Sequence, residues 1–297
     1  MRVVAILLGL VVLVAGSAML WQHWRYLRLR RDIVQDHQPV FHSPGVFHVL
    51  IFLEAAPGAD AVEEVRTLKR ATEGSEARWI YAGKVVLTAV ASSQIGEKDW
   101  SAIVLLQYPS RAAYDRQAQS EPLRTALGRF REVYTQGFQR WPLASALLPQ
   151  LFLAQRVGQI LRGRPSHFPF VRSGRADAVP QAEAYAQRLR AERELGAKAV
   201  VIVNLIKRGT PEQQAADRRY GASMFGAMAE GGYGPMHVGR AVRIERDYDF
   251  GAVVLVYYPG VDFFAEMVQS EFFQGIVGDK QLGDTQASIT VPILDRL

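Results

Sequence analysis

The sequence contains no cysteine, and this absence excludes several kinds of chemistry at once. Disulfide bonds, thiolate metal sites and cysteine nucleophiles all need the thiol group. The chain also lacks the short motifs of other common catalytic and metal centres, such as G-x-S-x-G and H-E-x-x-H. We therefore predict no metal site and no cofactor.

Acidic residues are missing from two long stretches. The formal net charge is +6, but residues 1–31 and 133–176 contain arginine without any aspartate or glutamate. The rest of the chain is net acidic, so the positive charge does not cover the predicted domains. A nucleic-acid binder needs a basic surface on its folded part. The charge distribution therefore argues against nucleic acid as a partner.

A long apolar run lies near the start of the chain. Val3–Trp21 is 19 residues without a charged side chain, which as a helix matches the ~30 Å hydrocarbon core of a bilayer. Aromatic residues and four arginines follow directly, within residues 21–31. The alternative is a signal peptide, whose apolar region is usually shorter, with Gly16–Ala18 as a weak cleavage site. We predict an uncleaved transmembrane anchor with a basic flank, residues 1–31.

The same flanks predict the orientation. Arginines concentrate after the apolar run, and the positive-inside rule places the arginine-rich side in the cytoplasm. We therefore expect a single-pass protein of the inner (plasma) membrane with its soluble part in the cytoplasm. The opposite orientation stays open, because Arg2 alone could hold a short N-terminus inside.

The soluble part contains an internal repeat. Trp100–Pro109 and Phe250–Pro259 align at an offset of 150, and each is an apolar run that ends in Tyr-Pro. The match continues without a gap to Gln-Ser-Glu at 119–121 and 269–271. Upstream, each copy has two further strand-like runs with a helical stretch between them. This self-similarity predicts two copies of one structural unit.

Each copy, 45–142 and 197–297, has the order β-α-β-β-α-β, which is the ferredoxin-like split βαβ motif. The strands are apolar at nearly every position, so both faces of each sheet must be covered. Helices cover one face, and the sheet of the other copy is the obvious cover for the second. The predicted fold class is α+β, with two tandem units that pair their antiparallel sheets into one α+β barrel behind a transmembrane helix.

These features resemble the dimeric α+β barrel superfamily, in which two ferredoxin-like units close their sheets into one barrel. The resemblance rests on element order, on the strand-Tyr-Pro-helix junctions at Leu106–Ser110 and Val256–Gly260, and on the duplicated Gln-Ser-Glu. It is closest to an uncharacterised branch. The superfamily includes cofactor-free monooxygenases, haem-using enzymes, isomerases and binding modules, so the fold implies no single chemistry. The haem-using branches need a histidine on the second helix, and none of the six histidines falls there.

Three polar residues on predicted strands of the second copy are candidates for a ligand site. Asn204 interrupts an apolar run at the position that Phe52 occupies in the first copy. His237 corresponds to Tyr81 of the first copy, and Tyr257 corresponds to Gln107. Each also has a simpler explanation, since buried polar groups usually bond to neighbouring backbone or pack at a rim. If the barrel holds a ligand, we predict that Asn204, His237 and Tyr257 line it, with His237 as the proton acceptor.

The connector at 143–196 is amphipathic and basic. Its apolar part, Leu143–Leu161, is interrupted by Pro149, and two interpretations stay open. It could lie on an anionic membrane surface, or it could pack on the barrel. A second, charged helix is predicted at 180–195.

The function that these features favour is a membrane-anchored small-ligand-binding module or an accessory module in an assembly. The alternative is a cofactor-free monooxygenase or isomerase that acts on a small aromatic or apolar substrate in the barrel. The partners expected are the membrane lipid bilayer, a membrane protein complex and a small apolar ligand. Polar groups that converge on a cavity would favour the enzyme. A filled barrel with an exposed apolar patch elsewhere would favour the accessory module.

Overall fold

The computed structural model describes residues 2–30, 41–174, 187–188, 190–191, 199–244, 248–281 and 284–297. In the first helix, side chains are described from Ile6 onward, Leu8 excepted. The charged helix predicted at 180–195 lies largely outside the described residues. Two helices stand apart from the repeated units: α1 (Arg2–Arg30) and α5 (Ala144–Leu161).

Each unit has the predicted element order, except that its second helix is split in two. The first unit consists of β1 (Phe47–Glu54), α2 (Ala61–Ala71), β2 (Arg78–Val90), β3 (Ala102–Tyr108), α3 (Arg111–Ala118), α4 (Glu121–Leu127) and β4 (Glu132–Arg140). The second consists of β5 (Val200–Ile206), α7 (Pro211–Gly231), β6 (Gly234–Val242), β7 (Ala252–Tyr258), α8 (Val261–Val268), α9 (Glu271–Ile276), η2 (Val277–Asp279), β8 (Gln286–Pro292) and η3 (Leu294–Arg296).

The duplicated Gln-Ser-Glu marks the point where the second helix is split. In the second unit, Gln269 ends α8 and the Ser270 hydroxyl accepts a hydrogen bond from the Phe273 amide at 3.1 Å. A serine in this position satisfies a backbone N–H that the first turn of a helix leaves unpaired. In the first unit, Ser120 stands at the same point before α4, but its side chain makes no capping bond and its hydroxyl donates to the Gln117 carbonyl at 2.7 Å. In both units the motif marks the start of the second half of the split helix.

The glycine-rich stretch at 231–234 ends α7. Gly232 adopts φ 73° and its amide donates to the Met228 carbonyl at 2.8 Å. A left-handed residue directly after a helix is most often glycine, because a Cβ would be strained there. The stretch is a helix stop before β6.

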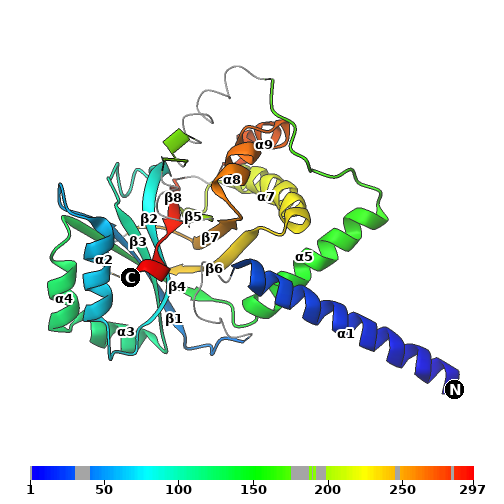
Figure 1. Ribbon diagram of the computed structural model, residues 1–297, viewed down its shortest axis with the longest axis horizontal. Helices are drawn as coiled ribbons and strands as arrows, with labels where there is room; N and C mark the ends of the chain where they lie inside the picture. The colour runs from blue at the N-terminus through cyan, green and yellow to red at the C-terminus, as the bar shows by residue number, and fades with distance from the viewer. Residues whose placement is uncertain are drawn as a thin grey trace.

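The eight strands form one closed antiparallel barrel in the order β1-β3-β2-β8-β5-β7-β6-β4 (Figure 1). Two pairings join the units: β2 pairs with β8, and β4 pairs with β6. The predicted closure of two sheets into one barrel within a single chain is confirmed. It is also the architecture that the resemblance to dimeric α+β barrels implies.

Helices cover the outside of the barrel, and one face of every strand lines the inside. The helices α2, α3 and α4 pack on the outer face of the first unit, with Val65, Leu68 and Tyr114 buried beneath them. The helices α7, α8 and α9 do the same for the second unit. Because strand neighbours alternate faces, every second residue of each strand points into the barrel. Phe52 and Phe138 are among the completely buried residues there.

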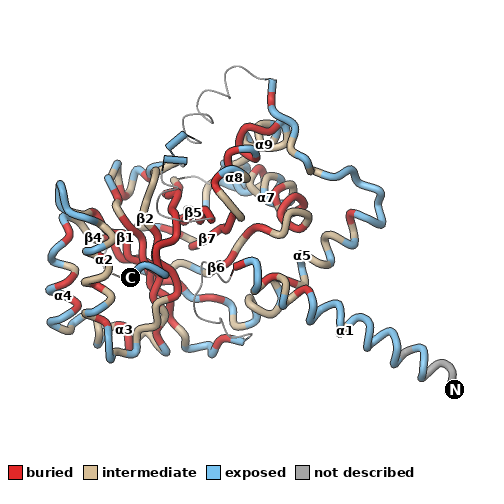
Figure 2. Tube along the Cα trace, viewed as in Figure 1, coloured by how far each residue is buried: buried red, intermediate tan, exposed pale blue. Residues whose placement is uncertain are grey.

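The helix α1 leaves the body of the molecule. Its last turns lie beside α5 and β6, while its N-terminal half projects away from the barrel, with exposed side chains along its length (Figures 1 and 2). Its exposed apolar residues are Ile6, Leu7, Leu10, Val11, Val12, Leu13, Val14, Met19 and Leu20. Among the residues whose side chains are described, no helix combines the length and the apolar character needed to cross a bilayer. The transmembrane role of α1 stays a prediction.

The helix α5 packs on the body with one face and exposes apolar residues on the other. Phe152 and Gln159 are buried against α1 and α7, and the Gln159 amide donates to the Gly226 carbonyl at 3.1 Å. Leu151, Ile160 and Leu161 are exposed. Packing on the barrel therefore leaves α5 with an uncovered apolar surface next to α1.

The seam between β4 and β6 offers a test of the barrel closure. Gly239 pairs with Arg140 across this seam, and a Cβ at Gly239 would lie 2.5 Å from the Gln139 carbonyl oxygen. This oxygen belongs to the backbone of β4 and cannot move without disturbing the strand pairing. Gly239→Ala should therefore lower the free energy of unfolding in urea by about 1–3 kcal/mol. The control is Gly221→Ala in α7, where nothing lies within 4 Å. It should be neutral or stabilising by about 0.5–1 kcal/mol. Equal stability of the two variants would contradict the seam.

Candidate ligand site at one end of the barrel

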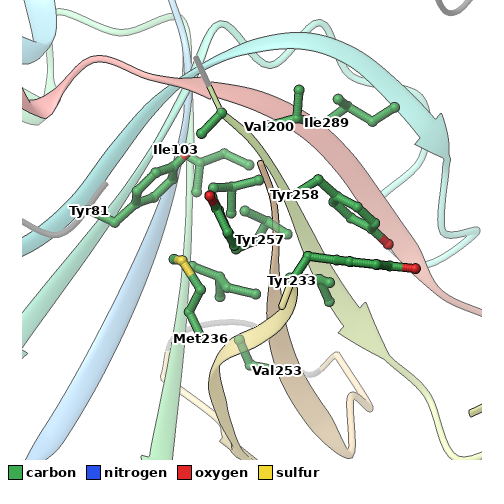
Figure 3. Packing of buried hydrophobic residues seen from close by; sticks show 14 of the residues in the cluster. Tyr81, Ile103, Val200, Tyr233, Met236, Val253, Tyr257, Tyr258 and Ile289 are labelled. Atoms are coloured by element: carbon green, nitrogen blue, oxygen red, sulfur yellow. The ribbon is translucent and has the colours of Figure 1, made fainter. Parts of the chain in front are cut away.

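Strand register places two of the three predicted site residues inside the barrel. On β7, Leu255 and Tyr257 face inward, and His237 of β6 pairs with Leu255. Figure 3 shows Tyr257 directed towards Tyr81 in the interior, while the next residue, Tyr258, points away beside Tyr233. His237 and Tyr257 thus share the inner face of the barrel.

Asn204 lies on the opposite face and does not join them. It pairs with Val254 on β7, an odd number of residues from Tyr257, so its side chain points to the helix layer. Its amide donates to the Val254 carbonyl at 3.2 Å and more weakly to the Ile202 carbonyl at 3.4 Å. A backbone-bonded asparagine is the simpler of the two interpretations of this residue.

A shift of one residue between the copies explains the misplacement of Asn204. Phe52 pairs with Ile103 in the first unit, and Leu205 pairs with Val253 in the second. Since Ile103 and Val253 are 150 residues apart, Phe52 corresponds to Leu205 and not to Asn204. One residue of error in a strand sends a side chain to the other face.

His237 is buried and has no partner among the described residues. Only 1% of it is exposed, and both ring nitrogens lack a hydrogen bond. Its counterpart in the first unit, Tyr81, is satisfied: its hydroxyl lies 2.5 Å from Thr290 Oγ1, which itself donates to the Val201 carbonyl at 2.8 Å. Leaving a buried polar group unbonded costs about 1–3 kcal/mol. At this pair of equivalent positions, the side chain of the second unit therefore lacks hydrogen bonds, whereas that of the first unit has them.

Two more histidines and an arginine lie beside His237. His48 of β1 is completely buried and stacks on Phe138, and His42 meets His48 edge to face at 5.7 Å between ring centroids. Arg140, at the end of β4, donates through Nη1 to His42 Nε2 at 3.0 Å. Sequence reasoning missed this group. The signal was the position of His48, which shares the inward face of β1 with Phe52.

The end of α1 closes this side of the barrel. The Tyr26 hydroxyl donates to the Pro235 carbonyl at 2.7 Å, which ties α1 to the start of β6. The Arg30 guanidinium lies 3.7 Å from the centroid of the Tyr26 ring and 5.1 Å from that of Tyr257. These distances suit cation–π contacts. A helix outside both repeated units thus contributes to the same cluster as His237.

The electrostatics of the cluster are strongly positive. Burial, followed by the charge of Arg140 and the proximity of the other histidines and Arg30, holds the pKa of His237 well below its usual range. Burial and Arg140 act in the same way on the pKa of His48, and they lower the pKa of His42 to about 4. Burial also lowers the pKa of Arg140 to about 10, so this guanidinium stays charged at neutral pH. The histidines are therefore neutral at neutral pH, and a neutral ring can accept a proton.

The three histidines do not form a metal centre. Within the described ranges, no group of three or more histidine, aspartate or glutamate side chains is arranged to hold an ion. What the cluster offers instead is hydrogen bonding from imidazole and guanidinium groups, with aromatic rings beside them. Groups of these kinds can hydrogen-bond to the polar atoms of a small molecule.

Comparison with known proteins finds similarity of structure alone, since no family model and no curated protein matches the chain. An anthrone oxidase-like protein is 8% identical over 84% of this chain and 92% of that one, with a TM-score of 0.44. A variant of chlorite dismutase from Candidatus Nitrospira defluvii is 9% identical over 85% and 94%, with a TM-score of 0.43. A provisionally named monooxygenase from Lactobacillus acidophilus NCFM is 9% identical over 84% and 94%, with a TM-score of 0.41. Likeness at this level carries no argument about activity.

The buried histidines predict a loss of stability in acid. An unfolded histidine titrates near pH 6.5, whereas folded His237 and His48 titrate well below that value. Below about pH 6.5 the unfolded chain binds protons that the folded chain does not, so the free energy of unfolding falls as the pH is lowered towards the folded pKa. Each such group contributes a slope of about 1.4 kcal/mol per pH unit in this window.

The variant His237→Phe should remove one of these groups and so make the slope shallower by about that amount between pH 6.5 and 5. Urea unfolding at a series of pH values measures it. Comparing slopes separates titration from the change in packing, which shifts the stability at every pH alike. The same slope in the variant and the unmodified chain would show that His237 is not held neutral.

Proposed function

We propose that this chain is a membrane-attached module that binds a small ligand at the end of its barrel where α1 and α5 lie. The observation that carries the proposal is His237, a completely buried imidazole whose two ring nitrogens have no partner among the described residues. Buried polar groups in folded proteins are almost always bonded. A bound ligand would supply the missing bonds, and the adjacent rings of Tyr257 and Tyr26 would pack on its apolar part.

The proposal uses His237 and Tyr257 of the three residues predicted from the sequence, together with His48. These residues come from both units of the barrel. The site therefore exists only in the closed, paired form of the chain. Asn204 lies on the other face of the sheet, where its side chain donates hydrogen bonds to the strand backbone.

Native mass spectrometry of the full chain tests this proposal. The unmodified chain, released from detergent, should carry the additional mass of a small molecule, and His237→Leu should lose it, since leucine offers no hydrogen bond. The control is Val238→Ala, one residue along β6, where the side chain is 37% exposed and faces away from the site. A chain that appears only at its own mass, or a mass that His237→Leu retains, would contradict the proposal.

We propose further that α1 attaches the chain to the inner membrane. The exposed apolar side chains of α1 and the exposed Trp21 and Trp24 suit hydrocarbon and an interface respectively. The uncovered residues of α5 lie beside them and could contact either lipid or a membrane protein complex.

The arginines that follow the apolar run, from Arg25 to Arg31, lead us to expect the barrel on the cytoplasmic side. Reporter fusions after residue 40 measure this: a reporter active only in the cytoplasm should be active, and one active only in the periplasm should be silent. The reverse pattern would place the barrel outside. Recovery of the full chain entirely in the soluble fraction after an alkaline carbonate wash would rule out the anchor itself.

A second candidate is a cofactor-free monooxygenase or isomerase acting on a small aromatic substrate. One observation favours it: the imidazole of His237 faces the inside of the barrel and has no hydrogen-bond partner among the described residues, so it is placed to contact a substrate there. The candidates differ in one measurable way. An enzyme converts the molecule that it binds, whereas a binding module returns it unchanged.

A further inference from the structure

Arg30 is a buried cation without a counter-charge among the described residues. It is only 4% exposed, and the hydrogen bond that it makes within this part of the chain runs from Nη1 to the Tyr26 carbonyl at 3.2 Å. Its other two nitrogens, Nε and Nη2, are buried and have no partner, and no described carboxylate forms an ion pair with it. A buried charge is normally paired, because removing it from water without compensation is costly.

The two unpaired nitrogens form one edge of the guanidinium. Elsewhere in the chain the same edge binds carboxylates. Arg129 donates to Glu64 from Nε at 2.6 Å and from Nη2 at 2.8 Å, and Arg219 donates to Asp279 from the same two atoms at 3.2 and 2.8 Å. These bidentate pairs have the geometry that arginine uses for carboxylate and phosphate groups. Arg30 presents this edge buried and unused.

The surroundings of Arg30 favour an anion. The charged Arg140 belongs to the same cluster, and the charges of both arginines help to hold the pKa of His237 below its usual range. Two guanidinium groups without a described acidic side chain between them create a positive potential that an anion would neutralise. The unbonded ring of His237 could donate a further hydrogen bond to the same group.

The space beside Arg30 is small. A void of about 10 Å³ adjoins its side chain, which is close to the room that one water needs. Five of its eight lining residues belong to α1, among them Gln22, Tyr26 and Leu29, and Phe152 of α5 lies on the other side. An occupant larger than water must therefore displace part of this wall, and α1 provides most of it.

We propose that Arg30 is the binding residue for an oxyanion, a carboxylate or phosphate group of the ligand, held side-on by Nε and Nη2 at the end of the barrel. This inference rests on the proposed ligand-binding function and adds the chemical class of the ligand. It makes α1 both the membrane attachment and one wall of the site. The oxyanion could belong to a free small molecule or to the headgroup of an anionic lipid, and the chemistry of recognition is the same.

Thermal unfolding of the full chain tests the proposal in two arms. In neutral detergent, inorganic phosphate should raise the unfolding temperature beyond that produced by chloride at equal ionic strength. In nanodiscs, phosphatidylglycerol should raise it relative to phosphatidylcholine alone. A response to phosphate identifies a free anion as sufficient, and a response to phosphatidylglycerol alone identifies the headgroup as the source. Either response supports an oxyanion site only if it depends on Arg30.

Variants of Arg30 show whether the response to anions depends on this residue. Arg30→Gln should weaken the apparent phosphate or lipid affinity about tenfold or more, because two charge-assisted hydrogen bonds are lost. The control is Arg28→Gln, two residues earlier on α1 and exposed, which should respond like the unmodified chain. If Arg30→Gln does not fold, Arg30→Lys keeps the charge without the paired donors, and its response should also be weaker. A merely structural arginine would change the starting unfolding temperature and leave the response to anions intact.

Several outcomes would overturn the inference. They are no response of the unmodified chain to phosphate or phosphatidylglycerol, an undiminished response in Arg30→Gln, and equal losses in Arg30→Gln and Arg28→Gln. A small molecule seen by native mass spectrometry that is lost in His237→Leu but kept in Arg30→Gln would leave the proposed function standing and show that its ligand is not anchored by Arg30. Absence of any bound molecule together with absence of an anion response would remove both.

Discussion

Strand pairing between the two units is the constraint on which the rest of this structure depends. Each unit has a sheet that is apolar on both faces, and its own helices cover only one of them. The seams β2–β8 and β4–β6 remove the open edges of both sheets and turn the second apolar faces towards each other. Closure therefore solves two problems of an isolated unit, the uncovered face and the unpaired edge. Glycines at the seam, such as Gly137 and Gly239, permit the close approach of the strands.

Placing both units in one chain allows them to differ. In a barrel made of two identical chains, every inward residue would occur twice. Here Tyr81 is bonded to Thr290, while His237, at the equivalent position, has no partner among the described residues. His48 and Arg140 from the first unit meet His237 and Tyr257 from the second at one end of the barrel only. The polar cluster is thus a product of the asymmetry between the copies.

The helix α1 connects this cluster to the part of the chain that carries the exposed apolar residues. Tyr26 bonds to the backbone at the start of β6, and Arg30 places its charge next to Tyr257. A movement of α1 relative to the barrel would change the environment of Arg30 and His237 together. The exposed apolar half of α1 and the cluster at its other end are therefore mechanically linked, because a helix transmits displacement along its axis.

The sequence by itself determined the elements of the fold. The offset of 150 between the Tyr-Pro junctions, the apolar strands and the element order were enough to predict two ferredoxin-like units in one barrel, because hydrophobic periodicity and turn residues act locally. They did not fix which face each strand residue occupies. Asn204 was placed inside by aligning it with Phe52, whereas pairing with β7 makes Leu205 the equivalent residue. Tyr257 was placed on the inner face because its offset of 150 from Gln107 is the offset of the Tyr-Pro junction, whereas His237 was placed by its separate match to Tyr81 at an offset of 156.

The membership of the cluster was decided only by the tertiary structure. Arg30 and His237 are separated by more than two hundred residues, and His42 and Arg140 by about a hundred. No local pattern in the sequence predicts that two arginines, one from each of the two stretches without acidic residues, will be buried beside three histidines. Burial and the lack of a carboxylate partner are properties of the packed barrel end, where β1, β4, β6, β7 and α1 converge. In the unfolded chain a charged side chain is hydrated, and only folding removes it from water.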